Sequence, residues 1–279
     1  MSPEARFEFG RNWRRFLSVL NDDRIREAEK SLREMLGCED LRGRSFLDIG
    51  SGSGLFSLAA RRLGARVHSF DYDPQSVACT AELKRRYFPD DAEWVVEQGS
   101  VLDRAYMERL AASDVVYAWG VLHHTGDMWK ALENVAIPVK DGGQLFVAIY
   151  NDQGEQSKRW LEIKKRYVSG WKGRWAVLVK YVPYFFLLCL KEDLLARRNP
   201  LRRYREYKKN RGMSVLTDWI DWFGGYPFEV AKPREITDFY APRGFVLAKM
   251  KTCGGDLANN EFVFRKGEGA AGTQPGGGR

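Results

Sequence analysis

Phe46-Leu47-Asp48-Ile49-Gly50-Ser51-Gly52-Ser53-Gly54 carries more structural information than any other stretch of this chain. A short apolar run, which predicts a strand, passes directly into three alternating glycines and then into a helix-forming segment. Glycine lets the backbone turn tightly and approach a ligand without a Cβ in the way, and the first turn of the next helix offers N–H donors. The stretch therefore predicts a nucleotide-binding turn at the end of a strand.

An acidic residue, Asp71, closes a second apolar run, Arg66-Val67-His68-Ser69-Phe70-Asp71. A carboxylate at the end of the neighbouring strand can accept hydrogen bonds from both hydroxyls of a ribose. A dinucleotide-binding turn requires G-x-G-x-x-G, and its third glycine would fall at position 55, which is Leu55. The spacing of the glycines therefore does not match the dinucleotide pattern.

The spacing Asp48-x-Gly50-x-Gly52-x-Gly54 resembles the first motif of the class I methyltransferases that use S-adenosylmethionine. In that family the loop wraps the methionine end of the cofactor. The stretch 117–125, Tyr-Ala-Trp-Gly-Val-Leu-His-His-Thr, looks like the fourth motif of the small-molecule O-methyltransferase-like branch. The resemblance covers residues 46–150 and 233–265, and it implies S-adenosyl-L-methionine as the cofactor.

The alternation of strand and helix patterns predicts an α/β fold, with a doubly wound, seven-stranded, mainly parallel, Rossmann-like sheet. The predicted strands are 45–50, 66–71, 93–97, 113–119, 143–150, 244–251 and 260–265. Predicted helices lie near 55–63, 75–87, 104–111 and 127–137, and another opens at Pro233. Only residues 252–259 separate the last two strands, which predicts a C-terminal antiparallel hairpin.

We expect five segments along the chain. They are an N-terminal helical cap (1–42), a cofactor-binding core (43–152), a helical insertion that acts as a substrate lid (153–231), the completion of the sheet (232–266) and a disordered tail (267–279). Within the cap, apolar residues recur at helical spacing; they are Phe7, Phe9, Trp13, Phe16, Leu17 and Leu20. These residues either close over the cofactor or pack against the edge of the sheet.

The resemblance also implies roles for individual residues. Asp71 would bind the ribose, with Tyr72 beside the adenine, and Trp119 would line the methionine and the methyl group; Asp73 is an alternative to Asp71, but it precedes Pro74 and suits a helix cap. The family often has Gly-Asp after the third strand, whereas this chain has Gly99-Ser100, so either Ser100 or Asp103 contacts the adenine. The candidate cofactor-binding residues are Asp48, Gly50, Ser51, Gly52, Asp71, Tyr72, Ser100, Val101 and Trp119.

Methyl transfer is an in-line displacement at a sulfonium, so an enzyme must align the nucleophile, exclude water and, for a hydroxyl, remove a proton. His123 and His124 follow the fourth strand, and neighbouring side chains diverge, so only one of them should face the substrate. We favour His124; alternatively, both residues support the cofactor loop. Asn151 and Asp152 follow Tyr150 at the end of the fifth strand, where this polar set either orients substrate or forms a turn. The same two interpretations apply to the polar set that begins the seventh strand, Asn259, Asn260 and Glu261. The predicted acceptor is an oxygen, or a nitrogen, of a small or lipid-linked molecule.

The composition of this 279-residue chain, with 44% hydrophobic and 29% charged residues, is that of a soluble globular protein. No C-x-x-C or C-x-x-H spacing occurs among its four cysteines, so we expect neither a metal site nor a disulfide framework. The N-terminus lacks the basic and then apolar pattern of a secretory signal, which favours a cytoplasmic location.

The net charge of +8 is concentrated in the insertion, where residues 158–211 hold 17 Lys and Arg against four Asp and Glu. Within it, the apolar stretch 175–190 is interrupted by Lys180 and Pro183, and we interpret it as too short to span a bilayer. Its basic flanks favour a pair of interfacial helices on an anionic membrane, peripheral to it; alternatively, its aromatics roof the active site.

Two other functions fit this basic insertion. It could dock tRNA or another RNA for modification, although its aromatics lie in apolar runs and not singly among Arg and Lys, which disfavours nucleic acid. The chain could also be a non-catalytic binding module at a membrane surface.

Overall fold

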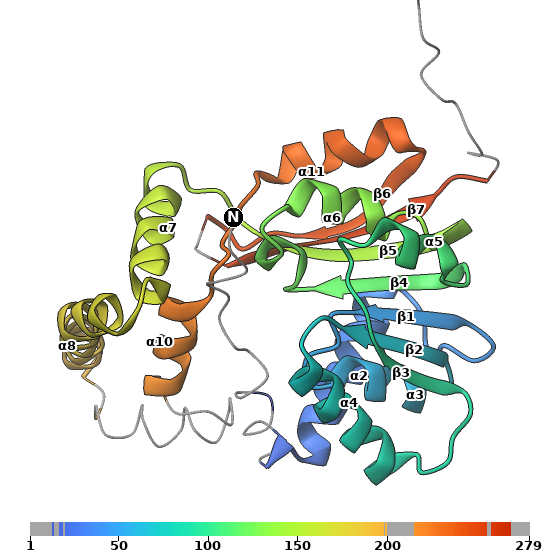
Figure 1. Cartoon of the computed structure of the whole chain (residues 1–279), viewed down its shortest axis with the longest axis horizontal. Helices are drawn as coiled ribbons and strands as arrows, with labels where there is room; N and C mark the ends of the chain where they lie inside the picture. The colour runs from blue at the N-terminus through green and yellow to red at the C-terminus, as the bar shows by residue number, and fades with distance from the viewer. Residues whose placement is uncertain are drawn as a thin grey trace, which may run out of the picture.

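A seven-stranded sheet with the order β3-β2-β1-β4-β5-β7-β6 forms the centre of the molecule (Figure 1). The computed structural model describes residues 13, 17, 18, 20–197, 199, 215–255 and 258–268. Phe7, Phe9 and Phe16 of the expected N-terminal cap, and residues 269–279 of the expected tail, lie outside the described residues.

The strands confirm the predicted sheet. Strands β1 to β5 run parallel to one another, and β7 pairs antiparallel with both β5 and β6. The seven strands are β1 (Ser45–Ile49), β2 (Arg66–Asp71), β3 (Trp94–Gln98), β4 (Ser113–Trp119), β5 (Val139–Tyr150), β6 (Phe245–Lys251) and β7 (Asn259–Lys266). Strand β5 begins four residues before its predicted start, because the pairing of β4 with β5 shifts register between Ser113 and Val115 and then resumes.

Helices cover both faces of the sheet (Figure 1). On one face the core contains residues of α2 (Asp22–Leu36), α3 (Leu55–Arg62) and α4 (Pro74–Tyr87). On the other face it contains residues of α5 (Arg104–Arg109), α6 (Met128–Val135) and α11 (Pro233–Tyr240). Neighbouring residues of one strand, such as Phe46 and Leu47, enter different core clusters. The central strands therefore carry apolar side chains on both faces, since both of their faces are buried.

Short-range capping fixes where several helices begin. The side chain of Asn21 accepts a hydrogen bond from the backbone of Arg24 at 3.1 Å, so α2 starts at Asp22. Asp73 caps α4 in the same way, with Pro74 in the first turn. The predicted cap segment 1–42 therefore contains a helix start at residue 22.

The insertion forms a separate group of helices beside one end of the sheet, on the left in Figure 1. It contains α7 (Glu155–Val168), α8 (Trp171–Leu195) and α10 (Val215–Gly224), which pack together through the cluster around Tyr167, Val177 and Phe223. Helix α8 continues through Pro183 for 25 residues, so the predicted pair of short helices in this stretch is wrong. The ring of Pro183 is tolerated because this residue is exposed, and water can satisfy the backbone carbonyl that loses its N–H donor.

Candidate functional site

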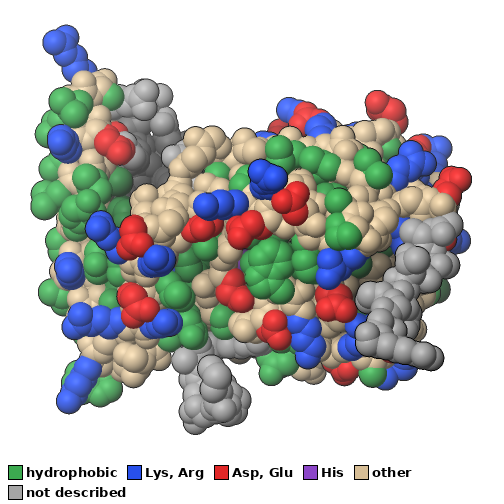
Figure 2. Space-filling model, turned by 90° about the horizontal axis from the view of Figure 1, so that it is seen from above, with side chains coloured by type: hydrophobic (Ala, Val, Ile, Leu, Met, Phe, Trp, Pro, Cys, Tyr) green, Lys and Arg blue, Asp and Glu red, His purple; other side chains and the backbone are tan. Residues whose placement is uncertain are grey.

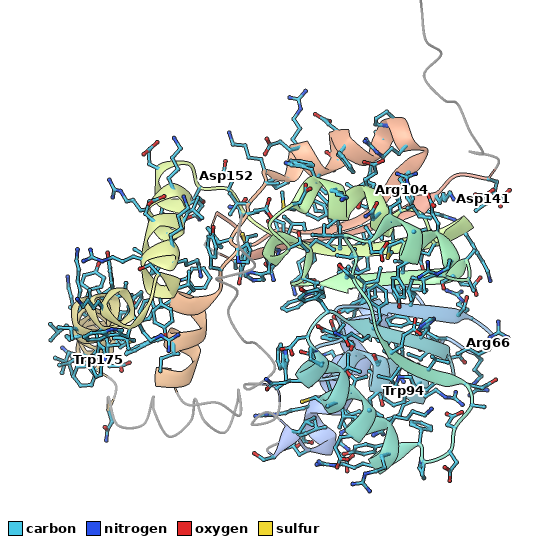
Figure 3. The ribbon with its side chains drawn as sticks, in the orientation of Figure 1. Arg66, Trp94, Arg104, Asp141, Asp152 and Trp175 are labelled. Carbon is cyan, nitrogen blue, oxygen red and sulfur yellow. The ribbon has the colours of Figure 1, made fainter. Side chains whose placement is uncertain are left out.

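A cavity of about 730 Å³ opens where β1, β2 and β4 end at their carboxyl termini. The chain leaves β1 toward β2 on one side, while β4 pairs with β1 on the other, so this is the point at which the strand order reverses. Open α/β sheets bind ligands in the crevice at such a point. Another cavity, of about 440 Å³, lies at the opposite ends of the strands beside Asp141, far from the helical insertion (Figure 3).

The glycine loop after β1 forms one wall of the larger cavity. Gly50 and Gly52 have φ angles of +72° and +55°, which residues with a Cβ rarely adopt. A Cβ at Gly50 would lie 2.5 Å from both methyl groups of Val121, and one at Gly52 would lie 3.1 Å from the ring of Trp13. The loop therefore needs glycine both for its conformation and for its contact with the loop after β4.

Asp71 lies at the end of β2, against the glycine loop. Its Oδ2 accepts from the N–H of Gly52 and its Oδ1 accepts from the N–H of Asp73, both at 2.9 Å. Burial raises the pKa of Asp71 to about 6. A carboxylate has about four acceptor sites, so Asp71 retains acceptor capacity for a ligand in the cavity. Asp73 instead accepts from the N–H of Gln75 and caps α4.

Asp48, at the base of the same loop, is almost fully buried and accepts a short hydrogen bond from the hydroxyl of Ser57. Ser57 also contacts the hydroxyl of Ser69 at 2.7 Å, and Ser69 accepts from the indole N–H of Trp94 on β3 (Figure 3). Burial raises the pKa of Asp48 to about 7, and the nearby charge of Asp71 acts in the same direction. This network attaches the loop to α3 and to two strands.

The loop after β3 supplies the next part of the wall. Ser100 and Val101 line the cavity, and Tyr72 lies opposite them with 60% of its surface exposed. Asp103 does not line it, because its carboxylate caps α5 by accepting from the N–H of Tyr106 at 3.1 Å. The sequence left either Ser100 or Asp103 as the residue that contacts the adenine, and of these two only Ser100 lines the cavity.

Trp119 ends β4 and completes the set of predicted cofactor residues, all nine of which line this one cavity. Its indole N–H donates to Oε1 of Glu261 at 3.1 Å, and its ring stacks beside Phe56 with centroids 6.3 Å apart. Forty per cent of its surface is exposed, so the ring offers an apolar face to the cavity.

His124 also lines the cavity, at the end of the short 3-10 helix η1 (Leu122–His124). Its Nδ1 lies 2.6 Å from the carbonyl oxygen of Pro227. A carbonyl oxygen only accepts, so Nδ1 carries the hydrogen and Nε2 is the basic nitrogen of the ring. Burial lowers the pKa of His124 to about 4, and the charge of Lys164 acts in the same direction, so the imidazole is neutral near pH 7.

The side chain of His123 lies outside the cavity wall. It is fully buried, does not line the cavity, and packs against the ring of Tyr150 with centroids 4.0 Å apart. Burial lowers the pKa of His123 well below the ordinary value for histidine. Only one histidine of the pair therefore reaches the cavity.

The structure does not bring Asn151 and Asp152 to the cavity. The side-chain oxygen of Asn151 accepts from Asn260 at 3.0 Å, and Asp152 accepts from the backbone of Gly154 at 2.8 Å, at the start of α7 (Figure 3). The side chain of Asn151 therefore links the end of β5 to β7, and that of Asp152 stabilises the turn that leaves β5, which is the alternative that the sequence allowed.

Two polar residues at strand ends do reach the cavity. Tyr150 is the last residue of β5 and Asn259 is the first residue of β7, and the sequence marks both as members of polar sets at this edge of the sheet. Burial raises the pKa of Tyr150 to about 12. The sequence prediction missed Tyr226, which reaches the cavity from the insertion and which no local pattern marks. Among the described residues, no group of three His, Cys, Asp or Glu side chains could hold a metal ion.

Sequence comparison shows that this chain is similar to methyltransferases. Residues 20–187 match the sequence model of a family described as "Methyltransferase domain". The chain is 33% identical over 148 residues to a ubiquinone biosynthesis O-methyltransferase of Methylobacterium sp. (strain 4-46), an alignment that covers 51% of this chain and 55% of the relative. It is 44% identical over 71 residues to the ribosomal protein L11 methyltransferase of Methylococcus capsulatus, covering 25% and 24%. The chain spans about half the length, or less, of these curated relatives.

Solved structures share the fold at low sequence identity. The magnesium protoporphyrin IX methyltransferase from Synechocystis PCC 6803, with bound SAH, aligns with a TM-score of 0.52 and 13% identity, covering 87% of this chain and 83% of that one. An N-methyltransferase from Bradyrhizobium japonicum WM9 aligns with a TM-score of 0.50 and 14% identity, covering 89% and 99%.

Proposed function

This chain belongs to the methyltransferase-domain family, and we propose that it transfers the methyl group of S-adenosylmethionine to an oxygen, or alternatively a nitrogen, of a small-molecule acceptor. The observation that carries the proposal is the common location of its candidate residues. All nine predicted cofactor residues and His124 line one cavity at the carboxyl ends of the parallel strands.

The cavity suits this cofactor. Its volume lies within the range of about 300–1,000 Å³ that is usual for small-molecule sites. Asp71 retains acceptor capacity for the ribose hydroxyls, and the exposed ring of Tyr72 offers an apolar surface beside it for the adenine. Leu55 occupies the position at which a dinucleotide-binding loop needs glycine, and its side chain enters the cavity wall.

When bound, S-adenosylmethionine supplies an electrophilic methyl group on a sulfonium. The loop from Gly50 to Gly52 would hold the methionine end, and Ser100 would contact the adenine. Asp71 would hold the ribose, with its carboxylate already oriented by the N–H groups of Gly52 and Asp73. Orientation of this kind lowers the entropic cost of alignment.

His124 would remove the proton from the acceptor. Its hydrogen bond to Pro227 fixes the ring and leaves Nε2 as the proton-accepting atom. Because burial holds the pKa of His124 near 4, the imidazole is unprotonated at neutral pH but is a weak base. Proton transfer to a weak base is most favourable from an acidic hydroxyl, so a phenolic oxygen suits this site better than an aliphatic alcohol.

The parts of the chain outside the sheet would close the site. Trp13 comes from the N-terminal segment and Tyr226 from the insertion, and both line the cavity. These contacts support the roles proposed for residues 1–42 as a cap and for residues 153–231 as a substrate lid. We also propose a cytoplasmic location, peripheral to an anionic membrane, which would give the site access to a lipid-linked acceptor as well as to a soluble one.

Calorimetry tests the cofactor assignment directly. S-adenosylmethionine and S-adenosylhomocysteine should each bind with 1:1 stoichiometry, and NAD should show no heat of binding above buffer. Saturable NAD binding together with no S-adenosylmethionine binding would show that the glycine loop serves a dinucleotide.

A further inference from the structure

Helix α8 presents large apolar side chains to solvent along its length. Trp171, Trp175, Val179, Leu187 and Leu195 are each more than 60% exposed. The first three follow one another at intervals of four residues, so they lie on one face of the helix. Soluble surfaces rarely expose apolar side chains as a contiguous patch, and such patches mark interaction sites.

The opposite face of α8 is occupied by protein. Tyr181 and Phe185 pack against Trp160 of α7, with ring centroids 6.4 and 6.1 Å apart, and both also contact Phe223 of α10. Trp175, Val179 and Leu187 therefore lie on the outer face of a packed three-helix layer. Trp175 lies at the outer left edge of the molecule in Figure 3, on the side away from the sheet.

Basic side chains accompany this apolar face. Residues 155–195 hold nine Lys and Arg against four Asp and Glu, and one of those acids, Asp193, is buried. Lys172 and Lys180 are exposed beside the apolar residues. Figure 2 shows hydrophobic and basic side chains interleaved down its left edge, on the side where α7 and α8 lie. This combination complements a surface that is anionic outside and apolar beneath.

We propose that the exposed face of α8, centred on Trp175 and Val179, docks on an anionic lipid bilayer, with the helix lying in the interface. Among the described helices, α8 is long and apolar enough, by length and composition, to cross a bilayer. The prediction that the stretch 175–190 is too short for this is therefore wrong, because the helix extends over residues 171–195. It lies in the interface instead, because its other face is packed on α7 and α10 and because Lys180 falls near its midpoint.

Docking of this face would bring the lid layer to the membrane. Aromatic contacts run from Phe185 through Trp160 and Trp222 to Tyr150, a residue of the cavity wall, with successive ring centroids 6.1, 5.3 and 5.8 Å apart. A lipid-borne acceptor would then enter beside α10. This last step rests on the proposed function, whereas the docking of α8 does not.

Vesicle sedimentation tests the docking. The full chain is mixed with vesicles of phosphatidylcholine alone, or with 30% phosphatidylglycerol, at about 0.1 M salt. The wild type should sediment with the anionic vesicles and be released by carbonate at high pH, as an interfacial protein is. The double variant Trp175→Glu/Val179→Glu should bind the anionic vesicles at least about tenfold more weakly than the wild type. The double variant Lys172→Glu/Lys180→Glu should lose most of the preference for the anionic vesicles.

Val246→Glu is the matched control, since Val246 is an apolar residue of β6 with 67% of its surface exposed. It should bind vesicles like the wild type. The proposal is overturned if the wild type stays in the supernatant with both kinds of vesicle, if Trp175→Glu/Val179→Glu binds like the wild type, or if carbonate fails to release the protein. It is also overturned if α8 instead forms a dimer that this variant dissociates. Calorimetry with S-adenosylmethionine on the same variants separates the two proposals, because vesicle binding without cofactor binding contradicts only the proposed function.

Discussion

The N–H of Gly52 donates a hydrogen bond to Oδ2 of Asp71 over 2.9 Å, and so joins the glycine loop after β1 to the acid that ends β2. The backbone N–H groups of Gly50 and Ser51 reinforce the link, because both donate to the carbonyl of Phe70 at 2.8 and 3.1 Å. Loop and carboxylate therefore form one preorganised unit, to which the ribose end of a nucleoside can bind without rearrangement.

Replacing Asp71 by Ala should weaken the binding of S-adenosylhomocysteine by about 1.5–3 kcal/mol, because a charged hydrogen-bond acceptor is lost. Calorimetry would measure this as a rise in Kd of about 10- to 100-fold. The control is Asp103→Asn, since Asp103 caps α5 and does not line the cavity. It should leave the Kd unchanged and should change stability little, because asparagine also serves as an N-cap. An unchanged Kd for Asp71→Ala would remove Asp71 from the ribose site.

The glycine requirement of the loop can be separated into two parts. Gly50 and Gly43 both have φ of +72°, but a Cβ at Gly43 would meet no atom within 4 Å, whereas one at Gly50 would collide with Val121. Gly43→Ala should therefore cost about 1–2 kcal/mol of unfolding free energy from backbone strain alone. Gly50→Ala should cost at least about 1 kcal/mol more and should also weaken cofactor binding. Equal losses in urea unfolding would show that Val121 moves aside freely.

Asp48 should make the stability of the cofactor-free protein fall as pH rises. Its pKa is about 7 in the folded state, above the ordinary 3.8, because burial penalises the charged carboxylate. Below the pKa that Asp48 has in the unfolded chain, the protonated carboxyl contributes its full stabilisation. This contribution is lost as pH rises through the pKa of the folded state, so the free energy of unfolding falls by on the order of 2–4 kcal/mol.

The variant Asp48→Asn isolates this effect, because asparagine can still accept from Ser57 and does not titrate. Unfolding in urea at pH 5, 6, 7 and 8 should show the wild type losing stability relative to Asp48→Asn across the series. A difference between the two proteins that stays constant with pH would mean that Asp48 is ionised throughout.

His124→Gln should lower kcat by about 10²- to 10⁴-fold, the usual contribution of a positioned general base, and should leave the Kd for S-adenosylmethionine unchanged. His68→Gln is the control, because His68 pairs with Glu97 on β3 and does not line the cavity. If kcat for His124→Gln stays within about threefold of the wild type, His124 only supports the loop after β4.

Much of the sheet could be predicted because the sequence patterns that specify its turns and helix starts are local. The glycine spacing after Ile49, and Asp73 before Pro74, each specify one turn or one helix start by short-range sterics and capping. The strand ends then followed from topology, since parallel strands bring their carboxyl ends to one edge of the sheet. That rule placed Asp71, Ser100 and Trp119 at the same cavity before any side chain was positioned.

Some side-chain positions could not be predicted, because they depend on contacts that the local sequence does not specify. Asn151 and Asp152 follow a strand as catalytic residues often do, but the side chain of Asn151 accepts from Asn260 of β7, which is distant in the chain. The side chain of Asp152 accepts from the backbone of Gly154 in the turn after β5. Tyr226 reaches the cavity only because the segment after α10 folds back over η1, where the N–H of Glu229 donates to the carbonyl of His123. No pattern near Tyr226 in the sequence records that contact.

Methyl transfer itself gives the most direct test of the central claim. Purified wild type and Asp71→Ala would each be incubated with methyl-labelled S-adenosylmethionine and either a lipid extract or a soluble metabolite extract. The account predicts that the wild type places label in an acceptor of one extract, with equimolar release of S-adenosylhomocysteine, and that Asp71→Ala does so far more slowly. Label only in the lipid fraction would make the acceptor lipid-linked, and label only in the soluble fraction would make the insertion a lid over a soluble acceptor. No transfer into either extract by a wild type that binds the cofactor would contradict the account, because the chain would then be a non-catalytic binding module.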